Sequence, residues 1–200
     1  MPALSQHSLV ASACVAGPPG LSHWLLVALL SILGTPAFAA QPPARESEVK
    51  ATLLFNFCHF VEWPAVAFAD KSAPFVIGIL GRDPFGRIID DLVKGEKTHG
   101  RSIEVRRFSR LEEMTEVHLL YVSPSEQTRI RGIIAELRGR PLLITGEEAE
   151  PGFTRFGGMI EFTTHGRNLK LRINLEEART AGLAISARLL RLAEVTRTQN

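Results

Sequence analysis

The sequence predicts an α/β protein with a single, mostly parallel central sheet flanked by helices and an antiparallel hairpin near the C-terminus. Short apolar segments of strand length alternate with amphipathic segments of helix length along the chain. Strands that are separated by helices pair in parallel through right-handed crossovers. The exception is one pair of segments near the C-terminus, which only a short turn around His165-Gly166 separates and which should therefore form a hairpin.

The composition is that of an ordinary globular protein. Of the 200 residues, 45% are apolar and 22% are charged, which excludes the disordered, collagen-like and disulfide-rich classes. The 23 basic and 21 acidic side chains nearly balance, so we expect no nucleic-acid partner. The chain contains no internal repeat and no long linker after residue 40, so residues 40–200 are expected to form a single domain.

The amino-terminal segment predicts export from the cytoplasm. The first 44 residues contain no Asp, Glu, Lys or Arg. Trp24–Leu33 is an apolar run broken only by Ser31, and it is too short to span a bilayer but has the length of a signal-peptide core. Ala37-Phe38-Ala39 then matches a cleavage site, so residues 1–39 are predicted to be a cleaved signal peptide. An uncleaved anchor is the alternative, and both versions place the folded part in the periplasm.

Cysteine usage predicts no disulfide within the mature chain. Cys14 lies in the predicted signal peptide, which leaves Cys58 as the only thiol after cleavage. Cys58 lies among three phenylalanines, so we expect it to be a small buried hydrophobe. An intermolecular bridge or a redox contact is the alternative.

The first half of the mature chain predicts two helices and two strands. Residues 46–63 form a helix that Pro64 ends, with an apolar stripe of Val49, Leu53, Phe57, Phe60 and Val61. Residues 74–80 form a strand covered on both faces. Asp83 as N-cap and Pro84 as first residue open a second helix, whose stripe is Phe85, Ile88, Ile89, Leu92 and Val93. Residues 102–108 alternate as a half-exposed strand.

The second half predicts further strands and two capped helices. Residues 117–122 and 141–145 form strands, and between them Ser123 and Glu126 form a capping box for a helix that ends near Gly139. Residues 159–163 and 169–173 form the hairpin. Asn174 and Glu177 form a second capping box, which opens a long last helix. Its predicted stripe is Ala178, Gly182, Ile185, Leu189 and Leu192.

The chain contains no recognisable catalytic motif, so we predict a protein that is not an enzyme and has no cofactor and no metal. Gly78, Gly81 and Gly86 fit neither dinucleotide nor P-loop spacing, and we expect a strand-to-helix turn there, with an anion aided by Arg82 as the alternative. The four mature histidines lack metal-ligand spacing, and His118 is expected in the core. The remaining candidates are expected to be cap, turn or surface residues: Ser123, Ser125, Glu112, Glu113, Glu116, Arg106, Arg107 and Arg110.

A loop rich in glycine and phenylalanine is the least ordinary segment. Phe153 and Phe156 precede Gly157-Gly158-Met159-Ile160. Glycines allow close approach of backbones, and the phenylalanines either attach the loop to the core or present a contact patch. Both interpretations remain open from the sequence.

From about Val49 to Val195 the chain resembles the YfiR family. The residues that carry the resemblance are Lys50-Ala51-x-x-Leu54-Phe55-Asn56-Phe57, Phe60-Val61-Glu62-Trp63-Pro64, Ile77-Gly78-Ile79-Leu80-Gly81-x-Asp83-Pro84-Phe85-Gly86, Gly100-Arg101-x-Ile103, Ser123-x-Ser125-Glu126, Gly157-Gly158-Met159-Ile160-x-Phe162, Ile173-Asn174 and Ala181-Gly182-Leu183-x-Ile185-Ser186. No single segment is decisive, but their number and order are specific.

The resemblance implies a periplasmic regulator that represses an inner-membrane diguanylate cyclase through the cyclase's periplasmic sensor domain. Such repression lowers cyclic di-GMP and biofilm formation, and an outer-membrane lipoprotein relieves it by capturing the regulator. A periplasmic small-ligand binding module that serves a sensor or transporter is the alternative. A hydrolase with an unrecognised site is a third hypothesis.

The resemblance also marks positions for partner contact. The first candidate surface comprises Gly157, Gly158, Phe162, Ile173 and Asn174. The second comprises Phe55, Asn56 and Trp63, and it could also form a homodimer. Phe57, Ile77, Ile79 and Ile185 are assigned to the core.

Overall fold

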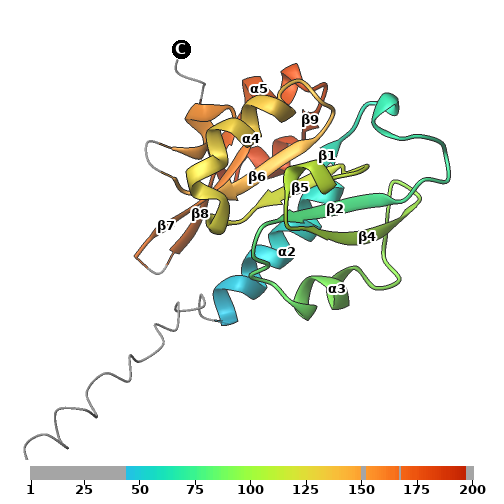
Figure 1. The fold of residues 1–200 in the computed structure, drawn as a ribbon, viewed down its shortest axis with the longest axis horizontal. Coiled ribbons are helices and arrows are strands. Elements are labelled where there is room, and N and C mark those ends of the chain that lie inside the picture. The colour runs from blue at the N-terminus through green and yellow to red at the C-terminus, as the bar shows by residue number, and fades with distance from the viewer. Residues whose placement is uncertain (1–43, 150–151, 167, 197–200) are drawn as a thin grey trace, which may run out of the picture. The chain divides into compact units, whose positions relative to one another are not determined.

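An eight-stranded sheet forms the centre of the computed structural model, which describes residues 44–149, 152–166 and 168–196 (Figure 1). The strand order is β10-β8-β7-β6-β5-β2-β4-β3. Their bounds are β2 Phe75–Leu80, β3 Lys97–Thr98, β4 Arg101–Phe108, β5 Leu119–Val122, β6 Leu143–Glu147, β7 Ile160–His165, β8 Asn168–Asn174 and β10 Ala193–Thr196. Among the described strands of this sheet, only β7–β8 and β3–β4 pair antiparallel. The predicted α/β class, the mostly parallel sheet and the C-terminal hairpin are confirmed.

Helices cover both faces of this sheet. They are α2 Ala44–Phe60, α3 Arg87–Val93, α4 Ile130–Leu137, α5 Leu175–Thr180 and α6 Ala187–Leu190. The short 3-10 helices are η2 Ala65–Ala67, η3 Leu111–Glu113, η4 Pro124–Arg129 and η5 Phe153–Phe156. A separate two-stranded ladder joins β1 Val61–Glu62 to β9 Ala184–Ile185.

The central strands divide the core into two parts because successive side chains point to opposite faces. On one face, Ile77, Ile79 and Tyr121 pack with α2 and α3. On the other, Leu80 and Leu120 pack with α4. Figure 1 shows α2 and α3 together on the side of the sheet away from α4. Strands with both faces covered explain the continuous apolar runs of the sequence.

The predicted apolar stripe of the first helix is partly wrong. Phe57 and Val61 are buried, but Val49 is 44% exposed, and Leu53 and Phe60 are half-buried. The buried face is instead made of Ser47, Lys50, Ala51, Leu54, Phe57 and Cys58. Lys50 can lie there because two carboxylates neutralise it, which apolar periodicity alone does not reveal. The helix also ends at Phe60, since the next two residues pair with β9.

The second helix begins later than predicted. The Asp83 carboxylate accepts a hydrogen bond from the amide of Phe85 at 2.7 Å, which forms a turn before the helix instead of a cap on it. Gly86, with φ of +53°, occupies the N-cap position of α3. The predicted burial of Phe85, Ile89 and Val93 is confirmed.

The capping box predicted before the third helix is only half formed. The Ser123 hydroxyl accepts from the amide of Ser125, and the chain first makes the 3-10 helix η4. The Glu126 carboxylate accepts from Arg129 Nη1 at 3.2 Å rather than reaching back to Ser123. The predicted apolar face of α4 is confirmed: Ile130, Ile133, Ile134 and Leu137 are buried.

The prediction of one long helix at the end of the chain is wrong beyond the first turns of that helix. Asn174 caps α5 as predicted, by accepting from the amide of Glu177 at 3.2 Å. The helix ends at Thr180, and Gly182 takes a φ of +77°, which turns the chain into β9. Ser186 then caps the separate helix α6, and the chain closes with β10. Leu192, predicted on the buried stripe, is 68% exposed.

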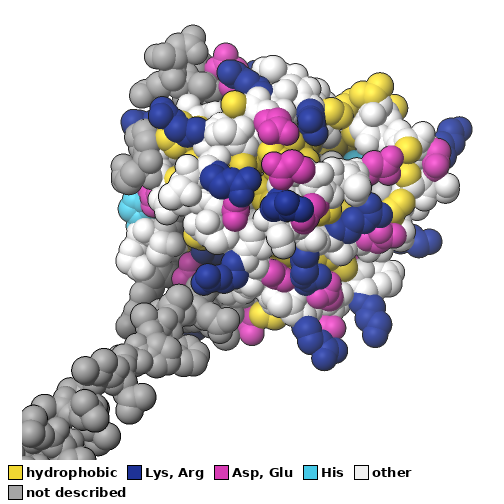
Figure 2. Space-filling view, viewed as in Figure 1, with side chains coloured by type: hydrophobic (Ala, Val, Ile, Leu, Met, Phe, Trp, Pro, Cys, Tyr) yellow, Lys and Arg dark blue, Asp and Glu magenta, His cyan; other side chains and the backbone are white. Residues whose placement is uncertain are grey.

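The described surface carries both signs of charge. On the face that Figure 2 shows, basic and acidic side chains are interspersed. Among the helices that the structure describes, none combines the length and apolar character that crossing a bilayer requires. The predicted signal peptide and its cleavage site lie outside the described residues.

Candidate functional site

The ring of Phe153 is enclosed by two glycines. A β-carbon on Gly158 would overlap the ring, and one on Gly146 would lie 2.5 Å from Phe153 Cε2. Gly146 is at the end of β6, and Gly158 follows η5 in the chain. Phe153 is fully buried in the core on the α4 face. The glycines therefore allow the loop after β6 to fold onto the sheet.

A buried carboxylate fixes the same loop. Glu161 on β7 is fully buried and accepts hydrogen bonds from the Phe153 amide at 2.8 Å and from the Thr154 hydroxyl at 3.1 Å. It also pairs with Arg172 at 3.0 Å, across the β7–β8 hairpin. A buried charge is tolerated only when it is paired and hydrogen-bonded, and Glu161 meets both conditions.

Asn174 extends this network to two helices. Its amide nitrogen donates to the Thr154 carbonyl oxygen at 3.1 Å, while its oxygen caps α5 through Glu177. The Glu177 carboxylate accepts from Arg138, at the end of α4, with distances of 2.6 and 3.2 Å. One connected set of polar contacts therefore joins β7, β8, η5, α4 and α5.

The structure places the whole first candidate surface inside the protein. Gly157, Gly158, Phe162, Ile173 and Asn174 are all buried. The Phe162 ring stacks on that of Phe57 at a centroid distance of 6.0 Å. Of the two interpretations that the sequence left open, burial favours the core. Contact with a partner at these positions stays a prediction, and in this conformation a partner would meet their neighbours first.

The second candidate surface is accessible. Phe55, Asn56 and Trp63 are each half-buried, at the end of α2 and just beyond it. The Trp63 indole donates to the His118 carbonyl oxygen at 2.9 Å, and its ring packs edge-on against Phe75 at 4.7 Å. Trp63 thus fixes the start of β5 and keeps part of its surface accessible to solvent. A half-buried aromatic residue of this kind is typical of contact surfaces.

The β1–β9 ladder brings two distant sequence motifs together at this end of α2. Val61 pairs with Ile185, and the Ser186 amide donates to the Phe60 carbonyl oxygen at 2.9 Å. A β-carbon on Gly182 would lie 3.4 Å from Pro64 Cγ. Ile185 was assigned to the core, and it is half-buried.

The core assignments of His118 and Cys58 are confirmed. The imidazole of His118 is buried, accepts from the Val76 amide at 3.0 Å and stacks on Phe68 and Phe75. Burial lowers the pKa of His118 from its ordinary 6.5 to about 4, so the ring is neutral at pH 7. Burial raises the pKa of the Cys58 thiol, which keeps it protonated and unreactive.

Sequence reasoning missed a charged cluster between α2 and the sheet. Lys50 is 6% exposed and donates to both carboxylate oxygens of Glu147, at 2.8 and 2.7 Å. It also pairs with Glu46 at 2.7 Å, and the Tyr121 hydroxyl donates to Glu147 at 2.6 Å. Burial and the Glu147 carboxylate raise the pKa of Tyr121. The cluster attaches the first helix to the carboxyl end of β6.

The edge of the sheet where α/β proteins usually bind ligands is closed. The strand order reverses at β2, whose neighbours β4 and β5 lie on either side, so ligands would be expected beyond the carboxyl ends of β2 and β5. There the Ser125 hydroxyl accepts from the Arg82 amide at 2.9 Å, and Ser125 and Glu126 leave no room for a side chain at Gly81. The neighbouring cavity beside Glu147 measures about 20 Å³, enough for about one water molecule.

The other candidates of the sequence analysis lie at the surface or in turns. Glu112, Glu113 and Glu116 are exposed around η3, and Arg107 pairs with Asp83 and Asp90, both at 2.7 Å. Across residues 44–149, 152–166 and 168–196, no group of three His, Cys, Asp or Glu side chains could hold a metal ion.

Most of the chain matches the model of a protein family. The family model described as YfiR/HmsC-like matches residues 47–194. The match begins within α2 and ends within β10, so it covers nearly all of the fold described above. No curated protein matches the chain.

Proposed function

Because the chain belongs to the YfiR/HmsC-like family, we propose that it represses an inner-membrane diguanylate cyclase by binding the cyclase's periplasmic sensor domain. Repression lowers cyclic di-GMP and with it biofilm formation. The observation that carries the proposal is the extent of the family match, which runs from α2 through β8 and into the start of β10. Membership in this family supports a regulatory rather than a catalytic role in the periplasm.

Repression of this kind is an allosteric coupling. A repressor shifts the cyclase toward its inactive state only if it binds that state more tightly than the active one. A 100-fold preference corresponds to about 2.7 kcal/mol. A few well-packed aromatic contacts supply a free energy of that size.

For the contact we propose the end of α2, with Phe55, Asn56 and Trp63. These residues are accessible in the folded protein, whereas the candidates around Gly158 are not. The buried network of Glu161 and Asn174 then has a supporting role, since it holds the sheet against which α2 packs. A homodimer through the same end of α2, and capture by an outer-membrane lipoprotein, would compete with cyclase binding.

A small-ligand binding module remains the alternative function. The closed edge at Gly81 and the cavity of about 20 Å³ beside it argue against a ligand at the place where this fold class usually binds one. The alternative requires a ligand that raises the melting temperature, with about 2.7 kcal/mol of added stability at a hundredfold excess over Kd.

The α2 surface can be tested by comparing two arginine substitutions. Asn56→Arg adds charge and bulk at the proposed contact, and Asn168→Arg makes the same change at an exposed position of β8. We expect Asn56→Arg to weaken binding to the cyclase's purified periplasmic domain by about tenfold or more, and Asn168→Arg to leave it unchanged. Equal affinities for the two variants would remove α2 from the interface.

A further inference from the structure

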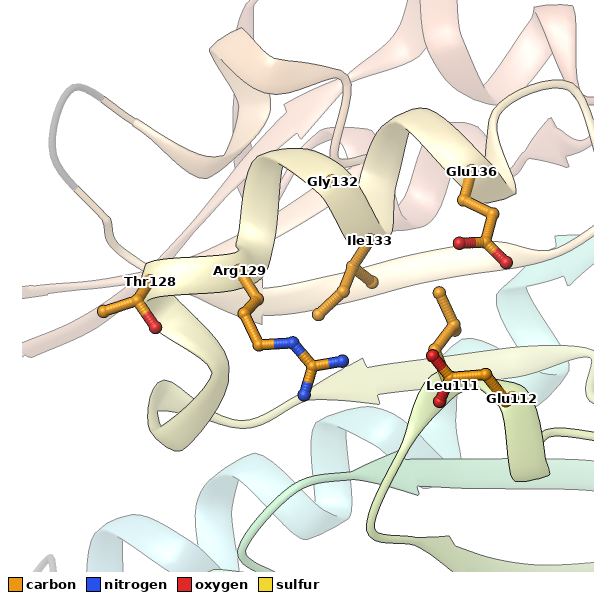
Figure 3. Close-up of a pocket in the computed structure, with 7 residues that line it drawn as sticks. All are labelled: Leu111, Glu112, Thr128, Arg129, Gly132, Ile133 and Glu136. Atoms are coloured by element: carbon orange, nitrogen blue, oxygen red, sulfur yellow. The ribbon is translucent and has the colours of Figure 1, made fainter.

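A groove lies between η3 and the helical segment formed by η4 and α4, away from the end of α2. It encloses about 400 Å³ and is lined by Leu111, Glu112, Thr128, Arg129, Gly132, Ile133 and Glu136. Figure 3 shows Glu136 extending from α4 and Glu112 from η3 into the same space, on either side of Leu111. Leu111 and Ile133 are buried, so they form an apolar floor below the charged rim.

Two of the carboxylates on the rim have no ion-pair partner. Within the part of the chain that the structure describes, Glu112 and Glu136 have no hydrogen bond or ion pair. Arg129, whose guanidinium group also points into the groove in Figure 3, pairs with Glu126 at 3.2 Å. Arg110, on the η3 side, pairs with Glu113 at 2.9 Å. Arg129, the cation that lines the groove, is thus engaged with Glu126, and the carboxylates of Glu112 and Glu136 face the groove without an ion-pair partner of their own.

The groove is too open for a small ligand. Glu112, Thr128, Gly132 and Glu136 are all exposed, whereas pockets for small molecules usually bury most of the ligand surface. The wall at Gly132 is bare helix backbone, since glycine has no side chain. The space in front of it is open, because a β-carbon there would meet nothing within 4 Å. An open groove with an apolar floor and bare backbone on one side can accommodate a side chain that projects from another protein.

We propose that this groove receives a segment of the protein partner that presents a Lys or Arg side chain next to an apolar one. The cationic group lies between Glu112 and Glu136, and the apolar side chain covers Leu111 and Ile133. The inference rests on the proposed function for the identity of the partner, which is the periplasmic domain of the cyclase. It adds a second contact to the one at the end of α2.

Two pairs of variants test the groove in cells where deletion of the gene raises cyclic di-GMP. Gly132→Trp fills the groove, and Gly132→Ala is its control, since a methyl group there touches nothing. Glu112→Lys combined with Glu136→Lys reverses the charge, and Glu116→Lys is the control on an exposed carboxylate outside the groove. We expect the first member of each pair to raise cyclic di-GMP toward the deletion level and to weaken binding to the cyclase domain about tenfold. Repression and affinity equal to those of the controls would overturn the proposal and leave the proposed function intact.

A measurement without the cyclase keeps the two proposals separate. The protein, purified from the periplasm and labelled with nitrogen-15, is titrated with acetyl-Leu-Lys-Leu-amide and with acetyl-Leu-Glu-Leu-amide. We expect the lysine peptide to shift the amide signals of Glu112, Gly132 and Glu136, and the glutamate peptide not to shift them. The charge-reversed variant should lose the response. Identical responses to both peptides, or none in the millimolar range, would overturn the groove proposal even if cyclase repression is established.

Discussion

The aromatic ring of Phe153 lies directly against the α-carbon of Gly158, in the space that any side chain at position 158 would occupy. This contact attaches the segment before β7 to the core, and it explains why position 158 is a glycine, while Gly157 takes a φ of +103°. The steric contact holds residues 152–158 against the core, and the network around Glu161 adds polar contacts to the same segment.

Gly158→Ala should destabilise the fold. A methyl group in contact with Phe153 overpacks the core and costs about 1–3 kcal/mol. Gly132→Ala is the matched control, because its methyl group meets no atom within 4 Å and alanine favours helix; it should be neutral or stabilising by about 0.5–1 kcal/mol. Urea denaturation followed by circular dichroism measures both, and equal free energies of unfolding would contradict the contact. Gly158→Asp should fail to fold for the same steric reason, and Phe162→Asp should fail because it would bury an unpaired charge.

Glu161→Gln should destabilise the protein by about 1–3 kcal/mol, because the amide keeps only one acceptor oxygen for the buried Phe153 amide and Thr154 hydroxyl, and because Arg172 keeps only its more distant partners Glu148 and Glu194, both at 3.8 Å. Glu176→Gln, on an exposed turn of α5, is the control and should change stability by less than about 0.5 kcal/mol. Thermal unfolding of the two variants makes the comparison. A small loss at position 161 would show that the network is not required for the fold.

Stability should fall as the pH drops from about 6.5 to about 4. The pKa of His118 is lower in the folded state, at about 4, than its ordinary 6.5, so folding favours the neutral ring. The stabilisation is complete above pH 6.5 and is lost as the pH falls toward 4, with an upper limit of about 3 kcal/mol.

The variant His118→Asn isolates this effect. Its side-chain oxygen can still accept from the Val76 amide, but it does not titrate in this range. The free energy of unfolding of the variant, measured by urea denaturation from pH 7 to pH 4, should depend less on pH than that of the wild type. Parallel curves would show that His118 does not control the acid sensitivity.

Lys50→Met should cost about 2 kcal/mol, because Glu147 loses its cation in a partly buried site. Adding Glu147→Gln removes the uncompensated charge, so the double variant should be more stable than Lys50→Met alone. A double-mutant cycle measured by urea denaturation gives the coupling, which we expect at about 1–3 kcal/mol. Strict additivity would mean that the ion pair does not stabilise the attachment of α2.

The parts of the fold that depend on local pattern could be predicted from the sequence. The run Pro74–Leu80 and the face of α4 are apolar at the spacing that their burial requires, and the hairpin turn is short. The end of the chain could not be predicted in this way. Ala178, Gly182, Ile185 and Leu189 fit a helical stripe, but the pairing of β9 with β1, more than 100 residues earlier, competes with the helix and prevails.

The polar contacts of the core were harder to predict because they join distant residues. Lys50 meets Glu147 across 97 positions, and nothing next to either residue indicates the other. Glu161 did leave a signal: it is an acid within the apolar segment Met159–Phe162, and in the predicted hairpin it stands opposite Arg172. The family resemblance marks the residues around Gly158, but it does not tell core positions from contact positions. In this conformation they are core positions.

The most direct test of the central claim is the concentration of cyclic di-GMP in a strain that lacks this gene. It should be compared with the parent strain and with a complemented strain, while candidate cyclases are expressed. Repression of a diguanylate cyclase predicts a rise on deletion that complementation reverses. An unchanged concentration would contradict the account and favour the small-ligand alternative.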